Sequence, residues 1–213
     1  MPMLIDLHVH TSPRSPCSTI NPAELVQEAK RIGLDGFCLT EHQVLWNWDE
    51  TTRLAGDNGI KIFRGNEITT AQGDVLVFGL DQEIPGIITI QELHQIVQSA
   101  GGFSIAAHPF RGFKMFGVGQ LGMTLDQACN KKILQFVDAV EIRNGRVTEK
   151  ENEVAGKVAE KLGLKGTAGS DAHEIVALGT WVTIFEKDIV TETDLLQGLK
   201  AGNFNVGSAR YSL

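Results

Sequence analysis

The sequence has few of the features that mark secreted, membrane-bound or nucleic-acid-binding proteins. Its three cysteines, Cys17, Cys38 and Cys129, are too few and too scattered for a disulfide framework. No apolar run approaches the roughly 20 residues that a membrane helix needs, and the first residues lack the basic region and long apolar stretch of a secretory signal. We therefore expect a cytoplasmic protein without a membrane partner.

An excess of positive charge is also missing. The net charge of −7 argues against a broad nucleic-acid surface, which is usually basic. A small anionic substrate is still compatible with this charge, because bound metal ions supply positive charge locally. The length of 213 residues fits one domain spanning 1–213, large enough to bury a sizeable core.

Short β-prone runs alternate with amphipathic stretches, without internal repeats. The expected strands are residues 4–7, 36–40, 61–66, 75–80, 103–107, 139–142, 165–168 and 181–185. The expected helices are residues 22–32, 90–100, 125–136, 149–162 and 192–201. This alternation favours an α/β fold with a largely parallel sheet, and the lack of a glycine-rich dinucleotide motif favours a closed barrel. Residues 46–59 and 111–122 are expected to be long loops.

Five of the six histidines lie at or just after the end of a β-prone run. His8 and His10 follow the first run, His42 the second, and the other two occur in Ala-Ala-His108-Pro and Ser-Asp171-Ala-His173. Glu67 ends the run that begins at residue 61 in the same way. Because the carboxyl ends of barrel strands share one face, we expect these side chains to converge.

Imidazole and carboxylate groups together are typical ligands of zinc, manganese and iron. His8 and His10 are two residues apart on an extended chain, so both side chains lie on the same side of the strand. A carboxylate such as Glu67 or Asp171 has two oxygens and can bridge neighbouring ions. A single histidine at a strand end is usually a hydrogen-bonded core residue, but five such placements indicate a metal centre. His94 lies beside the apolar stripe of a predicted helix and is interpreted as structural.

The ordered motifs from Asp6 to His173 resemble those of the PHP (polymerase and histidinol phosphatase) family, and most closely its short stand-alone phosphoesterases. The resemblance implies a distorted TIM-like barrel of about seven β/α units and two or three divalent ions, zinc, manganese or iron, at its mouth. It assigns His8, His10, Glu67 and Asp171 to the first ion. It assigns Glu67, as a bridge, and His108 to the second, and His42 and His173 to the third.

The chain departs from the family pattern at two positions. Cys17 stands where the family usually has an aspartate or histidine ligand of the third ion, so it is either a substituted thiolate ligand or a small buried thiol. Asp74 stands where many relatives have a histidine, and it either coordinates an ion or caps a turn. Glu141 matches an acidic family position and is either a ligand or an acceptor for a ligand histidine.

Arginine side chains near the motifs are candidates for binding the substrate phosphate, because the guanidinium fork matches phosphate geometry. Arg111, Arg143 and Arg146 are the main candidates, and Arg14 is a weaker one whose solvated-surface role is favoured. Trp46 and Trp48 either stack on a base or sugar, or pack their own loop down.

We therefore expect a metal-dependent phosphoesterase that hydrolyses a small phosphate mono- or diester, such as a nucleotide or sugar phosphate, with a metal-activated hydroxide as nucleophile. No Ser–His or Cys–His nucleophile is recognisable. An amidohydrolase-type metal enzyme is an alternative, although no lysine follows a strand in the manner that a bridging lysine requires. A non-catalytic metal-binding PHP module is a second alternative, kept open by Cys17 and Asp74.

Overall fold

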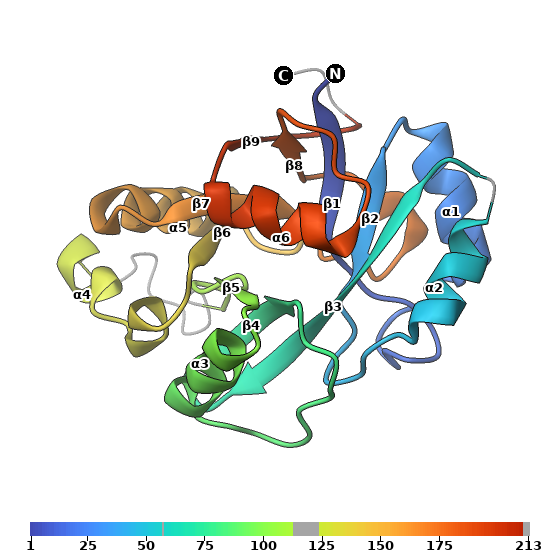
Figure 1. Ribbon diagram of the computed structural model, residues 1–213. Coiled ribbons are helices and arrows are strands. Elements are labelled where there is room, and N and C mark those ends of the chain that lie inside the picture. The colour runs from blue at the N-terminus through green and yellow to red at the C-terminus, as the bar shows by residue number, and fades with distance from the viewer. Residues whose placement is uncertain (57, 113–123, 211–213) are drawn as a thin grey trace.

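The computed structural model describes residues 1–56, 58–112 and 124–210. One sheet contains nine strands: β1 (Met3–Val9), β2 (Gly36–Leu39), β3 (Lys61–Thr70), β4 (Gly73–Phe78), β5 (Phe103–Ala106), β6 (Ala139–Asn144), β7 (Lys165–Gly169), β8 (Val182–Phe185) and β9 (Phe204–Gly207). The helices are α1 (Pro22–Arg31), α2 (Trp48–Ala55), α3 (Ile90–Ser99), α4 (Leu125–Cys129), α5 (Glu149–Leu162) and α6 (Glu192–Ala201), with 3-10 turns η1 (Lys132–Gln135) and η2 (Ile175–Ala177). Figure 1 shows these elements along the chain.

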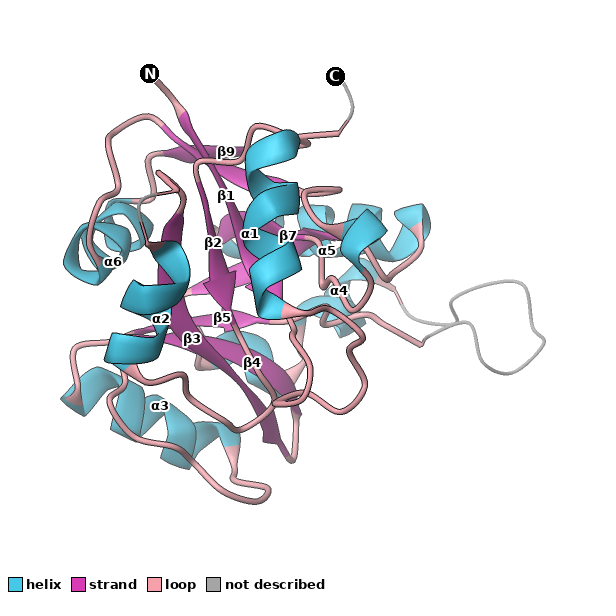
Figure 2. Cartoon of the chain, turned by 90° about the vertical axis from the view of Figure 1, so that its right-hand side faces the viewer, coloured by secondary structure: helices cyan, strands magenta, loops and turns pink. Residues whose placement is uncertain are grey.

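The strand order is β7-β6-β5-β4-β3-β2-β1-β8-β9, and the sheet curls until its ends approach each other. β1 meets the segment after β7 through a bridge between Val9 and Ala172, and the amide of Ala168 donates to Thr183 Oγ1 on β8. The result is a nearly closed, distorted barrel with helices around its outside (Figure 2). The expected α/β barrel is therefore confirmed, with nine strands instead of seven.

The sheet is only half parallel, so the expectation of a largely parallel sheet is wrong. β4 pairs antiparallel with both β3 and β5, and β8 pairs antiparallel with both β1 and β9. The reason at β4 is local: only two residues separate Thr70 from Gly73, a connection too short for a parallel crossover. The hydroxyl of Thr70 donates to the Gly73 carbonyl and closes this turn.

Two expected segments differ from the structure. The expected loop 46–59 contains helix α2, a short helix of 8 residues that begins at a capping box between Asn47 and Glu50 and buries only Thr51. The expected helix 125–136 ends at Cys129, because Lys131 adopts an extended backbone and its ammonium donates to the Pro109 carbonyl. The other expected loop, 111–122, lies mostly outside the described residues.

Side chains on the inner face of the strands form one apolar cluster that includes Leu7, Leu76 and Ile105, and Leu195 and Leu199 of α6 pack against it. Two further clusters lie under the outer helices, one with α3 and α5 and the other with α1. Among the described residues, no helix combines the length and hydropathy needed to cross a bilayer. The polar residues discussed next continue the strands beyond this apolar interior.

Candidate metal centre

Seven of the predicted ligands come together at the ends of the strands. His8 is in β1 and His10 follows it. His42 follows β2, and Glu67 is in β3, where its backbone forms a parallel β-bridge with that of His42. The remaining three follow β5 and β7: His108, Asp171 and His173. Six of the seven side chains are at most 9% exposed, and His42 is 41% exposed.

The imidazoles of His8 and His10 point at each other, with 3.0 Å between their Nε2 atoms. Both are close to Asp171, whose Oδ1 is 3.6 Å from each Nε2. Because only 3.0 Å separates the Nε2 atoms of His8 and His10, at most one of them carries a proton there. At least one nitrogen lone pair is therefore directed at the neighbouring nitrogen. Nitrogens and carboxylate oxygens directed at a common point are the arrangement that a divalent cation requires.

The described residues form three groups whose ligand atoms lie within 4.8 Å of one another. These groups are His8, His10 and Asp171; then His8, Glu67 and His108; and then His10, His42 and His173. The three groups parallel the three expected ions, except that His10 occupies the place considered for Cys17. Neither Cys17 nor Asp74 belongs to any of them, and Cys17 is exposed instead of buried.

Glu67 lies at the centre of the cluster. One carboxylate oxygen, Oε1, is 2.9 Å from His108 Nε2. The other, Oε2, is buried without a hydrogen bond among the described residues, although His42 Nδ1 is 2.9 Å and His10 Nε2 3.3 Å away. A buried carboxylate oxygen surrounded by nitrogen ligands but bonded to none is costly unless a cation completes its coordination. The donor set therefore fits bound metal ions.

Glu141 faces this cluster from behind. Its Oε1 accepts from His8 Nδ1 at 3.0 Å, and its Oε2 accepts from the backbone amide of His108 and from Asn144 Nδ2, both at 2.9 Å. With both oxygens occupied by these donors, Glu141 is placed to orient His8 and leave its Nε2 free for a metal. Of the two roles considered for Glu141, the geometry favours the acceptor.

The backbone is strained at two of the candidate ligands. His108 has a φ of 30° and Asp171 a φ of 53°, in the left-handed region that non-glycine residues seldom adopt. The hydrogen bond from the His108 amide to Glu141 helps to hold the first of these. Such strain persists where the surrounding structure over-determines it, and it is concentrated at functional sites.

The ion-free cluster has strongly perturbed proton affinities. Burial lowers the pKa of His8, but the charges of Glu141, Asp171 and Glu67 together raise it well above its usual value. The adjacent carboxylate of Glu67, 2.9 Å from His42 Nδ1, also raises the pKa of His42. Conversely, burial lowers the pKa of His173 to about 4, and the charges of His10 and Arg146 act in the same direction. Groups of this kind, in one cluster, are characteristic of functional sites.

Gly169, at the end of β7, allows the close approach of two strands. A Cβ atom at Gly169 would lie 2.5 Å from the Cβ of His8 and 2.9 Å from its backbone nitrogen, inside van der Waals contact. We expect Gly169→Ala to displace His8 and to lower metal affinity at least about 10-fold, the range seen when ligand orientation is lost. Metal titration by calorimetry measures this.

Gly156, in the middle of α5, provides the matched control. A Cβ there meets no atom within 4 Å, so Gly156→Ala should leave metal binding unchanged. Because alanine is the better helix former, this variant should also gain about 0.5–1 kcal/mol of stability. Equal metal affinities for the two variants would show that close packing at Gly169 does not position His8.

The candidate phosphate-binding arginines differ in their surroundings. Arg111 Nη1 lies 3.4 Å from Asp171 Oδ2, at the cluster itself, and it lines a pocket of about 350 Å³ that adjoins His108. Arg143 lies over the Trp181 ring and pairs with Glu149. Arg14 pairs with Glu50 in two hydrogen bonds and its side chain is 25% exposed, so it is engaged in structure and is not the freely solvated side chain that was favoured.

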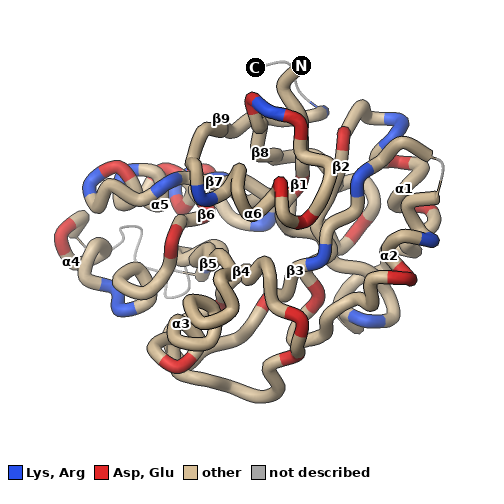
Figure 3. The backbone as a smooth tube through the Cα atoms, viewed as in Figure 1, with Lys and Arg blue, Asp and Glu red and all other residues tan. Residues whose placement is uncertain are grey.

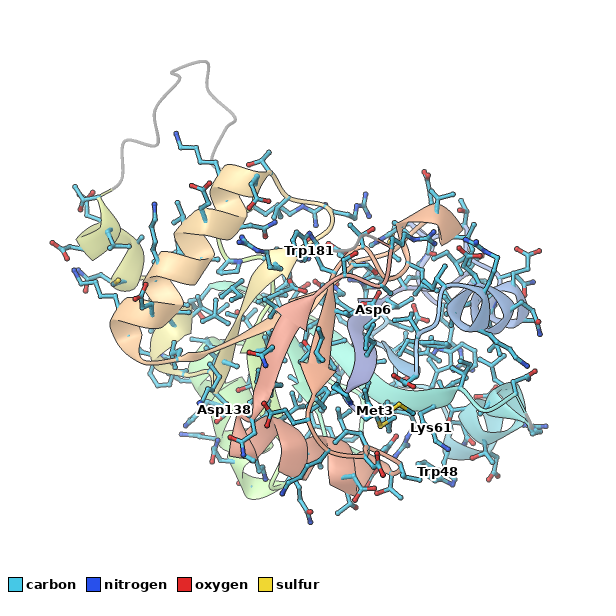
Figure 4. All side chains as sticks on the ribbon, turned by 90° about the horizontal axis from the view of Figure 1, so that it is seen from above. Met3, Asp6, Trp48, Lys61, Asp138 and Trp181 are labelled. Atoms are coloured by element: carbon cyan, nitrogen blue, oxygen red, sulfur yellow. The ribbon has the colours of Figure 1, made fainter. Side chains whose placement is uncertain are left out.

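The remaining aromatic candidates lie outside the cluster. Trp46 is 9% exposed and its indole N–H donates to Glu41, whereas Trp48 is 51% exposed at the start of α2, at the periphery in Figure 4. His94 Nδ1 donates to the Phe136 carbonyl oxygen at 2.8 Å, consistent with the structural role predicted for it.

Asp6, which sequence reasoning did not single out, is a supporting residue labelled in Figure 4. It is fully buried, and its carboxylate accepts from the amides of His8, Ser170 and Gly179. Burial raises its pKa to about 6. Asp6 thereby ties β1 to the segment that carries Asp171 and His173. A buried acid within an apolar strand is the only sequence signal that could have revealed it.

Comparisons with known proteins agree with this geometry. Residues 6–141 match the PHP domain family, and residues 149–204 match a family described as PHP-associated. Among solved structures, PsfC from Pseudomonas syringae is 22% identical with a TM-score of 0.70, covering 98% of this chain and 93% of that one. A two-domain protein from Bacteroides vulgatus containing a predicted PHP-like metal-dependent phosphoesterase is 19% identical with a TM-score of 0.71, covering 98% of this chain and 65% of that one.

A third similar structure is a lesion-specific endonuclease from Pyrococcus furiosus, which is 17% identical with a TM-score of 0.64, covering 97% of this chain and 58% of that one. At these identities the structures show a shared fold. The match to the PHP domain itself spans more than half of the sequence and includes five of the seven clustered ligands. The chain belongs to the PHP domain family.

Proposed function

We propose that this protein is a metal-dependent phosphoesterase that acts on a small phosphate mono- or diester. The observation that carries the proposal is the convergence of five imidazoles and two carboxylates from five strands around the unbonded oxygen of Glu67. Bound zinc, manganese or iron ions would supply Lewis-acid activation of water, whose pKa falls from about 15.7 towards about 7 on a metal. The protein offers such ions nitrogen and oxygen donors without a cysteine among the three groups.

The chain's own residues account for orientation and charge. Glu141 and Asp6 hold His8 and the Asp171 segment in place through hydrogen bonds. Arg111, beside Asp171, is placed to bind the non-bridging oxygens of a phosphate next to the cluster, and Arg146 brings a second positive charge close to His173. Arg143 is the weaker of the predicted phosphate ligands, because Glu149 and Trp181 occupy its guanidinium.

A small substrate is favoured over nucleic acid. In Figure 3 acidic and basic residues alternate along α1, α2 and α5 and do not gather into a basic stripe. The net charge of −7 points in the same direction. The pocket beside His108, lined by Arg111, Lys131 and Asp74 among others, supports recognition of a compact polar leaving group.

Turnover of model substrates tests the proposal. The protein, stripped with a chelator and reloaded separately with Mn²⁺, Zn²⁺ or Fe²⁺, should hydrolyse an aryl phosphomonoester or phosphodiester with at least one of these ions, and should lose that activity on renewed chelation. Turnover of an amide or an amino-nucleobase instead would favour an amidohydrolase. Ions bound without turnover of any substrate would favour a non-catalytic module. Cleavage of a DNA oligonucleotide alone would overturn the small-substrate assignment.

A further inference from the structure

A buried chain of hydrogen bonds lies behind His10, on the side of the imidazole that faces away from the cluster. His10 Nδ1 is 3.2 Å from Ser15 Oγ, and the Ser15 hydroxyl donates to Glu41 Oε2 at 2.5 Å. All three side chains are 0% exposed. None of the roles described above uses Ser15 or Glu41.

The direction of these hydrogen bonds follows from the number of protons. Glu41 has four donor groups directed at its two oxygens: the amide and hydroxyl of Thr11, the Ser15 hydroxyl and the Trp46 indole N–H. Ser15 has one hydroxyl proton, and it is given to Glu41. The Ser15 oxygen can therefore only accept from His10, which requires the proton of His10 to be on Nδ1. The lone pair of His10 is then on Nε2, which faces the cluster.

His10 has a special position among the ligands. Its Nε2 is shared by two of the three candidate groups, one with His8 and Asp171 and one with His42 and His173. Ser15 also accepts from the backbone amide of His42, at 3.3 Å, so the same oxygen contacts two members of the group formed by His10, His42 and His173. A change in the orientation of the Ser15 side chain would thus affect both groups that contain His10.

We propose that Ser15 and Glu41 are positioning residues that hold His10 in its Nδ1–H tautomer, so that its Nε2 is presented to metal ions. This inference rests on the metal centre proposed above. Ser15 is fully buried and its proton is committed to Glu41, so it acts through His10 and not as a nucleophile. Histidine ligands commonly depend on such a partner at the second ring nitrogen.

The chain of hydrogen bonds from His10 through Ser15 and Glu41 continues outward to helix α2. The Arg14 guanidinium lies 3.8 Å from the centre of the Trp46 ring and pairs with Glu50 of α2. Trp46 in turn donates to Glu41. The segment before α2 and the loop containing Arg14 are therefore fastened to the same carboxylate that orients Ser15, which restricts the positions available to Ser15.

Nuclear magnetic resonance of the Zn²⁺-loaded wild-type protein tests the tautomer directly. We expect a slowly exchanging His10 Nδ1–H proton and a Zn²⁺-bound Nε2 in nitrogen-15 spectra of the imidazoles. In Ser15→Ala, this proton should exchange rapidly and the affinity for Zn²⁺ should fall about 10–100-fold. Ser104→Ala is the matched control, since Ser104 is also a buried serine that donates to a carboxylate, Asp138, at the other end of β5 from His108.

Each outcome has a distinct meaning. A wild-type His10 that binds Zn²⁺ through Nδ1, or carries its proton on Nε2, would overturn the inference whether or not Ser15→Ala folds. Unchanged Zn²⁺ affinity in folded Ser15→Ala would overturn it as well, while leaving the phosphoesterase proposal intact. Failure of the wild-type protein to bind Zn²⁺, Mn²⁺ or Fe²⁺ would instead reject the metal centre itself, and this inference with it.

Discussion

Glu67→Gln should abolish metal-dependent turnover and remove bound metal, with activity falling by more than about 100-fold. Glutamine keeps the size of glutamate, but it has a single oxygen and its amide nitrogen has no lone pair for a cation. The loss should exceed the 10–100-fold typical of outer-shell substitutions, because Glu67 is placed to touch the ions themselves. Its oxygens lie 2.9 Å from both His108 and His42.

Metal content by elemental analysis, beside turnover of the aryl phosphate ester, provides the measurement. Glu160→Gln is the matched control, because it replaces the same side chain with the same amide at an exposed position of α5. Full metal content in Glu67→Gln would contradict the assignment of Glu67 as a shared ligand. Loss of metal in both variants would point to a general effect of the lost charge.

Metal affinity should rise steeply with pH up to the pKa values of the cluster histidines, which are raised above the ordinary value of 6.5. The pKa of His8, His42 and His108 is raised in the ion-free protein, in each case with a contribution from Glu67, so these imidazoles carry protons that an incoming ion must displace. Each proton displaced per ion increases the affinity about tenfold per pH unit. Two displaced protons would give about 100-fold, which makes this one of the largest effects expected.

Calorimetric titration with Mn²⁺ in buffers of different ionisation enthalpy counts these protons. The stability of the ion-free protein should depend on pH in the opposite direction. A histidine whose pKa is raised by folding contributes its full stability below the unfolded pKa of 6.5, and this contribution is lost as the pH rises through the folded pKa. Chelated protein should therefore become less stable towards alkaline pH as these imidazoles lose their protons. Metal uptake without proton release would contradict this description of the cluster.

The barrel and the convergence of these side chains could be predicted from the sequence, whereas the pairing of individual strands could not. A ligand at a strand end is a local signal, and the order of strands in a barrel makes such ends meet, so His8, Glu67 and His108 could be placed together in advance. The antiparallel position of β4 depends on the two-residue connection after Thr70, which was not recognised as a hairpin. Helix α2 is only 8 residues long and buries only Thr51, so its sequence offers few apolar positions by which a helix could be predicted.

Supporting residues were the least predictable part of the site. Ser15 and Glu41 adjoin recognised motifs, yet their function depends on the distance between side chains 26 residues apart in the sequence. Asp6 likewise appears as an ordinary strand residue until its amide partners on the far segment are known. Cys17 was left open between a thiolate ligand and a small thiol, and among the described residues it belongs to none of the three groups.

The positive φ angles of His108 and Asp171 separate two demands on the same positions. Glycine or asparagine would relax the backbone there, whereas only an imidazole or a carboxylate supplies the donor atom that the cluster uses. Selection for thermal stability alone would therefore favour substitutions that remove a candidate metal ligand. Stabilising substitutions should therefore be sought at helix positions with free space, such as Gly156, and not at His108 or Asp171.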